Sequence, residues 1–186
     1  MRVKRELSIG EWAVLALLCE RPRHGYALAA AMAPDGEIGQ IWSLGQPLTY
    51  RALSVMQSLG LVEVNATTPG DRAPRRTELR ATVRARRLVA RWLREPVLRP
   101  RDLRSELLLK IAFLRRRRRP LGPLLGQQRE ILLARLADLD AQLAADPGPL
   151  ADVIRWRRIS ADAGLRFVDE LLAREPASAA ATPVAR

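Results

Sequence analysis

The chain has 186 residues, of which 48% are hydrophobic and 28% are charged. Such a composition is typical of a folded globular protein and argues against intrinsic disorder, and the length suits one compact domain or two small ones. The longest apolar run, residues 12–19, is far shorter than the roughly 20 residues of a membrane-spanning helix. The net charge of +12 favours a polyanionic partner such as a nucleic acid.

The positive charge is spread along the chain and does not by itself locate a binding site. Residues 1–95 carry 15 basic and 9 acidic side chains, and residues 96–186 carry 17 and 11, so that each part has a net charge of +6. The single cysteine, Cys19, excludes an internal disulfide and is compatible with a reducing compartment. Because the basic N-terminus also lacks the pattern of a secretory signal peptide, we expect a cytoplasmic protein.

Three helices are predicted in the first 60 residues. The first begins at Ser8, a good N-cap, and Glu11 completes a capping box. A short helix is predicted over 26–32, after a turn. The third is predicted over 46–59, because proline at its second position suits a first helical turn and the glycine that follows suits a C-terminal stop.

A β-ribbon and a fourth helix are predicted next. Residues 61–65 alternate apolar and polar side chains, which indicates a strand, and a loop rich in proline and glycine leads to a second strand at 75–80. The helix expected over 82–94 carries a stripe of arginines that we interpret as a solvated face. Three helices followed by a two-stranded ribbon form the layout of a winged helix-turn-helix.

The C-terminal part is predicted to be helical. A joint at 95–100 precedes a helix over 102–119, and a further helix has leucines at near-heptad spacing between 125 and 143. Such a stripe suits packing against another helix, either from the same chain or from a second subunit. A last helix is predicted over 150–174.

Together these elements predict a mainly α protein. We expect an N-terminal winged helix-turn-helix DNA-binding domain with a two-stranded β-wing at residues 1–95 and a C-terminal helical dimerisation domain at residues 96–174. The tail at 175–186, rich in alanine, serine and proline, is expected to be disordered.

The outward face of the helix over 46–59 is the predicted DNA-reading surface. On a helical wheel its apolar residues cluster on the side expected to face the core: Leu48, Ala52, Val55, Met56 and Leu59. The other side is polar and has no acidic residue: Gln46, Tyr50, Arg51, Ser54, Gln57 and Ser58, with Thr49 at the border. Because a carboxylate would be repelled by phosphate, this face suits the major groove of DNA. An ordinary polar surface is the alternative explanation.

The side chains on this face suit different roles. Arg51 matches the O6 and N7 acceptors of guanine, and Gln46 matches adenine in the same bidentate way. The hydroxyl groups of Thr49, Tyr50 and Ser54 suit phosphate oxygens. At the tip of the ribbon, three arginines are expected to reach phosphates or the minor groove: Arg72, Arg75 and Arg76.

The order and spacing of several short segments resemble the PadR family of transcriptional regulators. The segments are Ala-Val-Leu-Ala-Leu-Leu at 13–18, Pro-Arg-His-Gly-Tyr-Ala-Leu at 22–28, Tyr-Arg-Ala-Leu at 50–53, Leu-Gly-Leu-Val at 59–62, Trp-Leu-Arg-Glu-Pro at 92–96 and Arg-Ser-Glu-Leu-Leu-Leu-Lys at 104–110. The sequence departs from the family at Ala85, where glycine is frequent, and at Leu79, where an aromatic residue is frequent. The resemblance implies a winged helix, a C-terminal helical dimerisation region, repression from a palindromic operator and response to a small, commonly aromatic ligand.

A few other residues have the chemistry for binding. Trp42 and Trp156 are candidates for an aromatic ligand pocket, although packing in a core explains them at least as well. His24, the only histidine, is expected to make a structural hydrogen bond rather than to sense pH. Because the sequence shows no cluster of metal ligands, no nucleophile–base pair and no glycine-rich phosphate loop, we predict no enzymatic activity and no metal or cofactor.

The leading hypothesis is a homodimeric, ligand-responsive transcriptional repressor. Its partners would be a palindromic operator in double-stranded DNA, a second copy of the chain and a small aromatic effector, without any membrane. The alternative is a winged-helix module that binds another protein and has no DNA target, a hypothesis favoured by the even distribution of charge.

Overall fold

The computed structural model describes residues 6–68, 76–145 and 148–175. Contacts within the chain divide it into two compact units. The first unit comprises residues 1–93 and 104–113, and the second comprises residues 94–103 and 114–186. The segment 104–113 therefore belongs with the N-terminal unit, whereas the expected division into functional domains at residue 95 stays a prediction.

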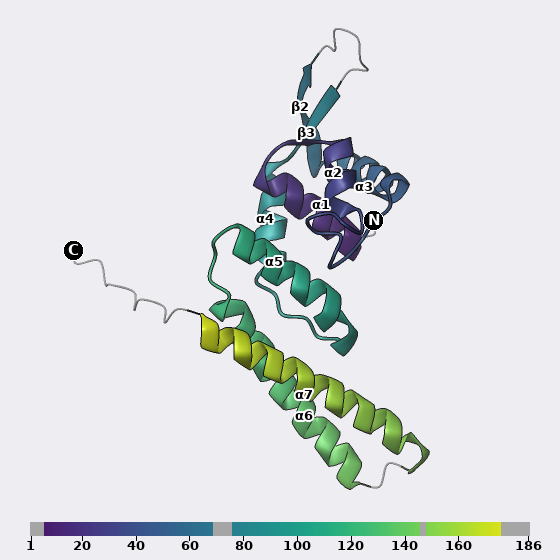
Figure 1. The fold of residues 1–186 in the computed structure, drawn as a ribbon, viewed down its shortest axis with the longest axis vertical. Helices are drawn as coiled ribbons and strands as arrows, with labels where there is room; N and C mark the ends of the chain where they lie inside the picture. The colour runs from purple at the N-terminus through teal and green to yellow at the C-terminus, as the bar shows by residue number, and fades with distance from the viewer. Residues whose placement is uncertain (1–5, 69–75, 146–147, 176–186) are drawn as a thin grey trace, which may run out of the picture. The chain divides into compact units, whose positions relative to one another are not determined.

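Three helices form the centre of the first unit (Figure 1): α1 (Ile9–Glu20), α2 (Gly25–Met32) and α3 (Gln46–Ser58). The start of α1 is as predicted, because the Ser8 hydroxyl accepts a 3.3 Å hydrogen bond from the Glu11 N–H and the Glu11 carboxylate accepts a 2.7 Å bond from the Ser8 N–H. Residues 13–18 of α1 are completely buried, since α2, α3 and a fourth helix, α4 (Val83–Trp92), all contact it.

A three-stranded antiparallel sheet completes the winged helix. Its strands are β1 (Arg23–His24), β2 (Val62–Thr68) and β3 (Arg76–Ala81), in the order β1-β3-β2. Strands β2 and β3 form the predicted hairpin, with a register shift between Val64 and Ala66 that leaves Asn65 as a bulge. The predicted fold class, a mainly α protein with a winged helix-turn-helix and long C-terminal helices, is confirmed, and the short strand β1 adds a third member to the sheet.

A buried aromatic and ionic cluster attaches the segment 104–113 to the first unit. The chain enters this region through a 3₁₀ turn (Pro100–Asp102) and a π-helical turn (Leu103–Leu107) before α5 (Leu108–Arg116). The Glu106 carboxylate accepts a 2.8 Å hydrogen bond from the Trp92 indole N–H and pairs with the Lys110 ammonium at 2.8 Å. Lys110 is 1% exposed and lies 5.3 Å from the centroid of Trp92, which stacks on Trp12.

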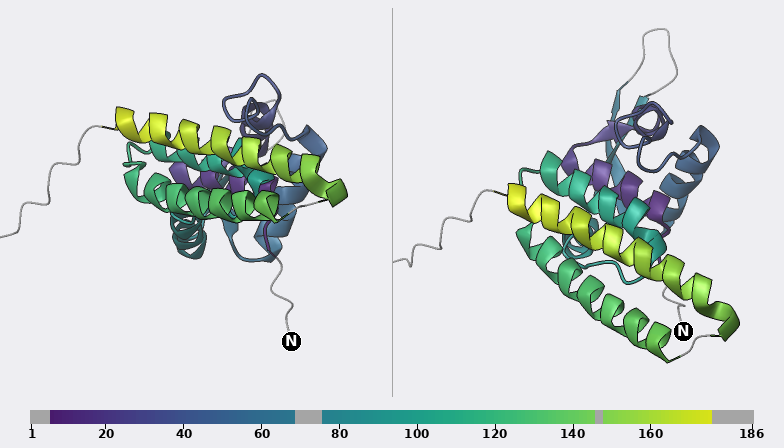
Figure 2. Two further views of the ribbon diagram at one scale, coloured as in Figure 1. Left: turned by 90° about the horizontal axis from the view of Figure 1, so that it is seen from below. Right: turned by 60° about the horizontal axis from the view of Figure 1, so that its bottom comes forward.

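The second unit is built on two long antiparallel helices, α6 (Gly122–Ala144) and α7 (Ala151–Arg174), which the views in Figure 2 show side by side. A 3₁₀ turn (Gly148–Leu150) precedes α7. Buried residues recur every seven positions on both helices: Leu125, Leu132 and Leu139 on α6, and Ile154, Ala161 and Val168 on α7. Two ion pairs join the helices: Arg129 to Asp169 at 2.8 Å and Arg158 to Asp140 at 2.5 Å. The helical partner predicted for the leucine stripe is therefore α7 of the same chain.

For residues 95–119, which precede α6, the structure revises the end of one predicted helix and adds contacts to the expected joint. The helix expected over 102–119 ends at Arg116, because Arg118 has a φ of 51° that is incompatible with a right-handed helix. The joint expected at 95–100 is attached to α6, since the Val97 N–H donates to Gln128 Oε1 over 2.8 Å and Gln128 Nε2 donates to the Val97 carbonyl over 3.0 Å. The chain from residue 176 onward lies outside the described residues.

Candidate nucleic-acid interface

The C-terminal end of α3 is defined by its main-chain hydrogen bonds. The Gly60 N–H donates to the Gln57 carbonyl and the Leu61 N–H donates to the Met56 carbonyl, each over 2.9 Å. These bonds form a Schellman motif, which needs a left-handed residue after the helix cap. Gly60 supplies it with a φ of 65°, a conformation that glycine adopts without a steric penalty. The predicted stop is confirmed, and α3 ends at Ser58.

The buried face of α3 is rotated from the predicted one. Four residues of α3 are at most 5% exposed: Thr49, Ala52, Leu53 and Met56. Leu48, expected in the core, is 53% exposed. Thr49, expected to contact phosphate, is completely buried, and its hydroxyl donates to the Gly45 carbonyl over 3.2 Å. The helical wheel placed Thr49 at the polar border of the helix. Because a main-chain carbonyl at the start of α3 accepts the hydrogen bond of its hydroxyl, the side chain can occupy a core position.

The outward face of α3 keeps the other predicted side chains. Gln46, Tyr50, Arg51 and Ser54 are all exposed, and α3 contains no acidic residue. Within the described part of the chain, the Arg51 guanidinium makes no hydrogen bond or ion pair. The guanidinium is therefore available to an external acceptor.

Tyr50 is oriented by the start of α2. A Cβ atom added to Gly25 would lie 2.7 Å from Tyr50 Cε1 and 3.3 Å from its hydroxyl oxygen. The ring thus occupies space that only a glycine at position 25 leaves open, while 43% of Tyr50 remains exposed. This contact links the outward face of α3 to α2.

The turn between β3 and α4 holds the other end of α3. The Thr82 hydroxyl donates to the Gly60 carbonyl over 3.1 Å, and it also accepts from the Ala85 N–H as the N-cap of α4. Arg84 Nη1 donates to the Leu59 carbonyl over 3.1 Å. The sequence pattern identified Arg84 only as part of a solvated stripe, because a bond to a residue 25 positions away leaves no periodic signal.

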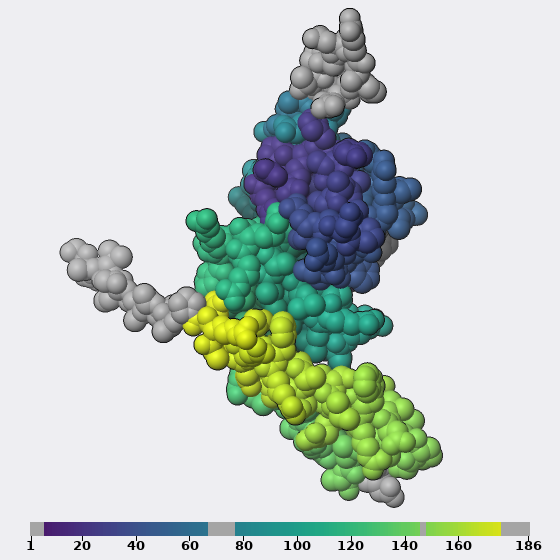
Figure 3. All heavy atoms as spheres, viewed as in Figure 1, coloured from purple at the N-terminus to yellow at the C-terminus, as the bar shows by residue number. Residues whose placement is uncertain are grey.

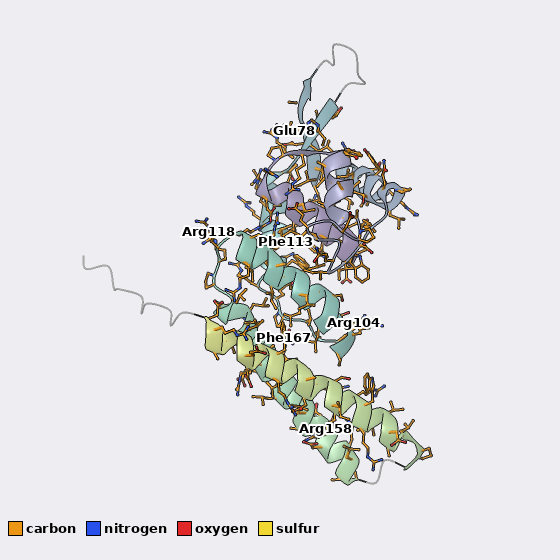
Figure 4. All side chains as sticks on the ribbon, viewed as in Figure 1. Glu78, Arg104, Phe113, Arg118, Arg158 and Phe167 are labelled. Atoms are coloured by element: carbon orange, nitrogen blue, oxygen red, sulfur yellow. The ribbon has the colours of Figure 1, made fainter. Side chains whose placement is uncertain are left out.

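The wing is described only in part. Arg72 and Arg75 lie outside the described residues, and Arg76 is the first residue of β3. In the described part of the hairpin, Arg80 pairs with Glu63 at 2.8 Å. Asn65 donates to Glu78, which Figure 4 labels on the hairpin. The DNA contacts predicted for the three wing arginines stay predictions.

The structure changes the interpretation of His24 and of the tryptophans. The Nδ1 atom of His24 is buried and has no hydrogen-bond partner among the described residues, so the structural bond expected for this side chain is not formed at that atom. Trp42 is 37% exposed in the first unit, and Trp156 is 69% exposed in the second. Packing in a core is therefore wrong for Trp156, and the ligand pocket stays a prediction.

Three observations concern other types of site. Within residues 6–68, 76–145 and 148–175, no helix has both the length and the apolar character needed to cross a membrane. The same residues contain no group of three or more His, Cys, Asp or Glu side chains placed to hold a metal ion. Cys19 is half-buried near the end of α1.

Solved structures similar to this chain include PadR and PadR-like transcriptional regulators. PadR of Bacillus subtilis in complex with operator DNA is 20% identical with a TM-score of 0.46, and the match covers 89% of this chain and 98% of that chain. The same regulator in complex with p-coumaric acid is 18% identical with a TM-score of 0.42, over 92% and 97% of the two chains. A PadR-like regulator of Bacillus cereus is 13% identical with a TM-score of 0.41, over 92% and 98%. No protein-family model and no curated protein matches the chain.

Proposed function

We propose that the chain is a sequence-specific DNA-binding transcriptional regulator that reads the major groove with the outward face of α3. One observation carries this proposal: α3 presents an exposed face without an acidic residue, and on it the Arg51 guanidinium has no hydrogen bond or ion pair among the described residues. Both ends of this helix are held by contacts within the winged helix-turn-helix. An α-helix fits the major groove of B-DNA, and in this motif the recognition helix carries the base-reading side chains.

The proposed contacts differ from residue to residue. Arg51 would take guanine through two hydrogen bonds, and Gln46 would read adenine in the same way. The hydroxyls of Tyr50 and Ser54 would bind phosphate oxygens. Thr49 is left out because its hydroxyl is buried and already bonded within α3. Arg72, Arg75 and Arg76 of the wing would add phosphate or minor-groove contacts.

A second apolar stripe on α7 supports a homodimer. One side of α7 is buried against α6, and five exposed apolar residues follow helical spacing on another side: Val153, Trp156, Ile159, Ala163 and Phe167. Figure 3 shows α7 as yellow-green spheres on the face of the second unit turned to the viewer, and Figure 4 labels Phe167 on this helix. We propose that the same stripe of a second copy covers it, because a two-fold interface uses one patch twice. Two copies of α3 would then match a palindromic operator.

We further propose repression and control by a small aromatic effector, which the resemblance of the segments at 13–110 to the PadR family implies, and we place the activity in the cytoplasm. Trp42 in the first unit and Trp156 in the second, both partly exposed in the single chain, are two separate candidates for an effector contact, Trp156 only where the second copy leaves it accessible. Tryptophan fluorescence of the parent and of Trp156→Phe would be titrated with aromatic carboxylic acids, in parallel with DNA affinity. Saturable quenching that leaves DNA affinity unchanged would indicate ligand sequestration instead of ligand-controlled repression.

Selection of bound sequences from a random DNA pool tests the central proposal. We expect enrichment of an inverted repeat whose half-sites lie about one helical turn, roughly 10 base pairs, apart. Affinity for it should fall steeply with salt, because phosphate contacts release counterions. If no sequence is enriched even at low salt, and the protein's own promoter is not protected in footprinting, the winged-helix protein-interaction module becomes the better proposal.

A further inference from the structure

The exposed leucine in the first turn of α3 is not explained by the packing of the protein. Leu48 is 53% exposed, and Pro47 beside it is exposed as well. The core position in this turn is taken by Thr49, which is completely buried. An apolar side chain is thus presented to the outside at the N-terminal end of the helix that carries the proposed DNA contacts.

Leu48 lies on the same side of α3 as Arg51. Positions three and seven apart on a helix share a face, so that Leu48, Arg51 and Val55 form one line along α3. Val55 is half-buried, so this line of residues runs from the exposed Leu48 toward the protein interior. The outward face therefore has a hydrogen-bonding group, the Arg51 guanidinium, directly next to an apolar one.

The base edges in the major groove contain one apolar feature, the C5 methyl group of thymine. Residues three apart on a helix are about 4.5 Å apart along its axis, which is close to the roughly 3.4 Å rise between successive bases of a strand. Leu48 and Arg51 would therefore reach neighbouring base pairs. Charge does not oppose this approach, because α3 has no acidic residue.

We propose that Leu48 is a specificity residue that contacts the C5 methyl group of a thymine next to the base pair read by Arg51. The inference rests on the proposed function, since it assigns a base to a residue of the same helix face. It predicts that each half-site contains a thymine at a position adjacent to the guanine that Arg51 requires.

Replacing thymine by deoxyuridine tests this contact, because deoxyuridine differs from thymidine only in the missing methyl group. Each thymine of the selected operator would be replaced in turn, and affinity would be measured for the parent, for Leu48→Ala and for Leu133→Ala, a control leucine on α6 that is 36% exposed. We expect the parent to lose about fourfold in affinity at one position per half-site, the equivalent of one buried methyl or methylene group. Leu48→Ala should bind the thymine and deoxyuridine operators equally at that position, while Leu133→Ala should discriminate like the parent.

Two results would overturn the proposal in distinguishable ways. If Leu48→Ala binds the operator but keeps the parent's preference for thymine at every position, Leu48 does not read the methyl group, and DNA binding by α3 still stands. If the parent shows no preference for thymine over deoxyuridine anywhere, the proposal is likewise wrong. If the parent selects no DNA sequence at all, the proposed function fails together with this inference. A thermal unfolding curve of Leu48→Ala like that of the parent would exclude loss of folding as the cause.

Discussion

In the first unit, two arginines of α4 donate to main-chain carbonyls at the ends of other helices, whereas in the second unit arginines of α6 and α7 bond to acidic side chains of the neighbouring helix. In α4, Arg84 donates to the Leu59 carbonyl and Arg86 donates to the Cys19 carbonyl over 3.4 Å. Between α6 and α7, the ion pairs are Arg129 with Asp169 and Arg158 with Asp140. Residues 1–95 and residues 96–186 each carry a net charge of +6, yet among the described residues Arg51 of α3 has no acidic partner, whereas Arg129 and Arg158 have one each. The comparison teaches that the pairing of the charges, more than their sum, distinguishes the proposed DNA-binding surface from the rest of the chain.

The ion pairs of the second unit make the basic residues that form them less suited to binding phosphate. A hydrogen bond from Arg158 to Asp140, together with the negative charge of that carboxylate, raises the pKa of Arg158 above its ordinary value. Arg158 is labelled on α7 in Figure 4. A guanidinium held in this way has a carboxylate beside it that would repel phosphate. We therefore expect substitutions in the two units to affect different properties.

Phe113→Ala should have the largest effect, on stability. Phe113 is completely buried in the segment that belongs to the first unit, and removing a buried phenylalanine side chain costs about 3–5 kcal/mol. Phe167→Ala, the same substitution at a side chain that is 37% exposed on α7, should cost about 1 kcal/mol or less. Denaturant unfolding at low protein concentration would measure both. Equal losses for the two variants would contradict the assignment of Phe113 to the core.

Trp156→Asp should have the next largest effect, on self-association. A charge in the exposed stripe of α7 would meet the apolar stripe of the second copy, and central interface residues of this kind contribute about 2 kcal/mol or more. Sedimentation velocity would report a shift from dimer to monomer. Leu98→Asp is the control, because Leu98 is 77% exposed and lies outside α7. A dimer that persists in Trp156→Asp would locate the interface elsewhere.

Arg51→Ala tests whether the guanidinium on the outward face of α3 contributes to DNA binding. Loss of a bidentate contact to guanine should weaken operator binding by about 1–3 kcal/mol and relax the choice of base at one position of each half-site. Arg155→Ala is matched to it, because Arg155 is exposed on a helix but pairs with Asp152 at 2.9 Å. Its effect on operator affinity should stay within about 0.5 kcal/mol. Similar losses in both variants would mean that DNA responds only to total charge.

The parts of the fold that could be predicted from the sequence depend on local signals. The capping box at Ser8 and Glu11 and the stop at Gly60 act within a few residues, and both were found where the pattern indicated them. The alternation in β2 and the turn residues after it predicted a hairpin for the same reason. These elements were sufficient to identify the winged helix.

The details of the candidate site depend on tertiary contacts and could not be predicted in the same way. Thr49 entered the core and Leu48 left it, because the position of α3 against α1 and α2, which hydrophobicity alone does not determine, sets the buried side. The sequence pattern gave no burial for Lys110, which is 1% exposed, and Glu106 and Trp92 compensate its charge inside the first unit. In both cases the polar group bonds to an oxygen four positions earlier, a spacing that exposed helical pairs share and that therefore does not indicate burial.

Arg84→Ala should have the smallest effect, and it tests whether the helix-end contacts of α4 position α3. Removing the bond to the Leu59 carbonyl should lower stability by about 0.5–1 kcal/mol, the lower part of the usual range for a hydrogen bond, because the contact is exposed. Arg87→Ala is the control, since Arg87 is exposed on the same helix and its replacement by alanine removes the same charge. Operator affinity should fall further in Arg84→Ala than in Arg87→Ala, because only the first loosens the end of α3. Equal affinities in the two variants, measured at one salt concentration, would show that α4 contributes charge alone.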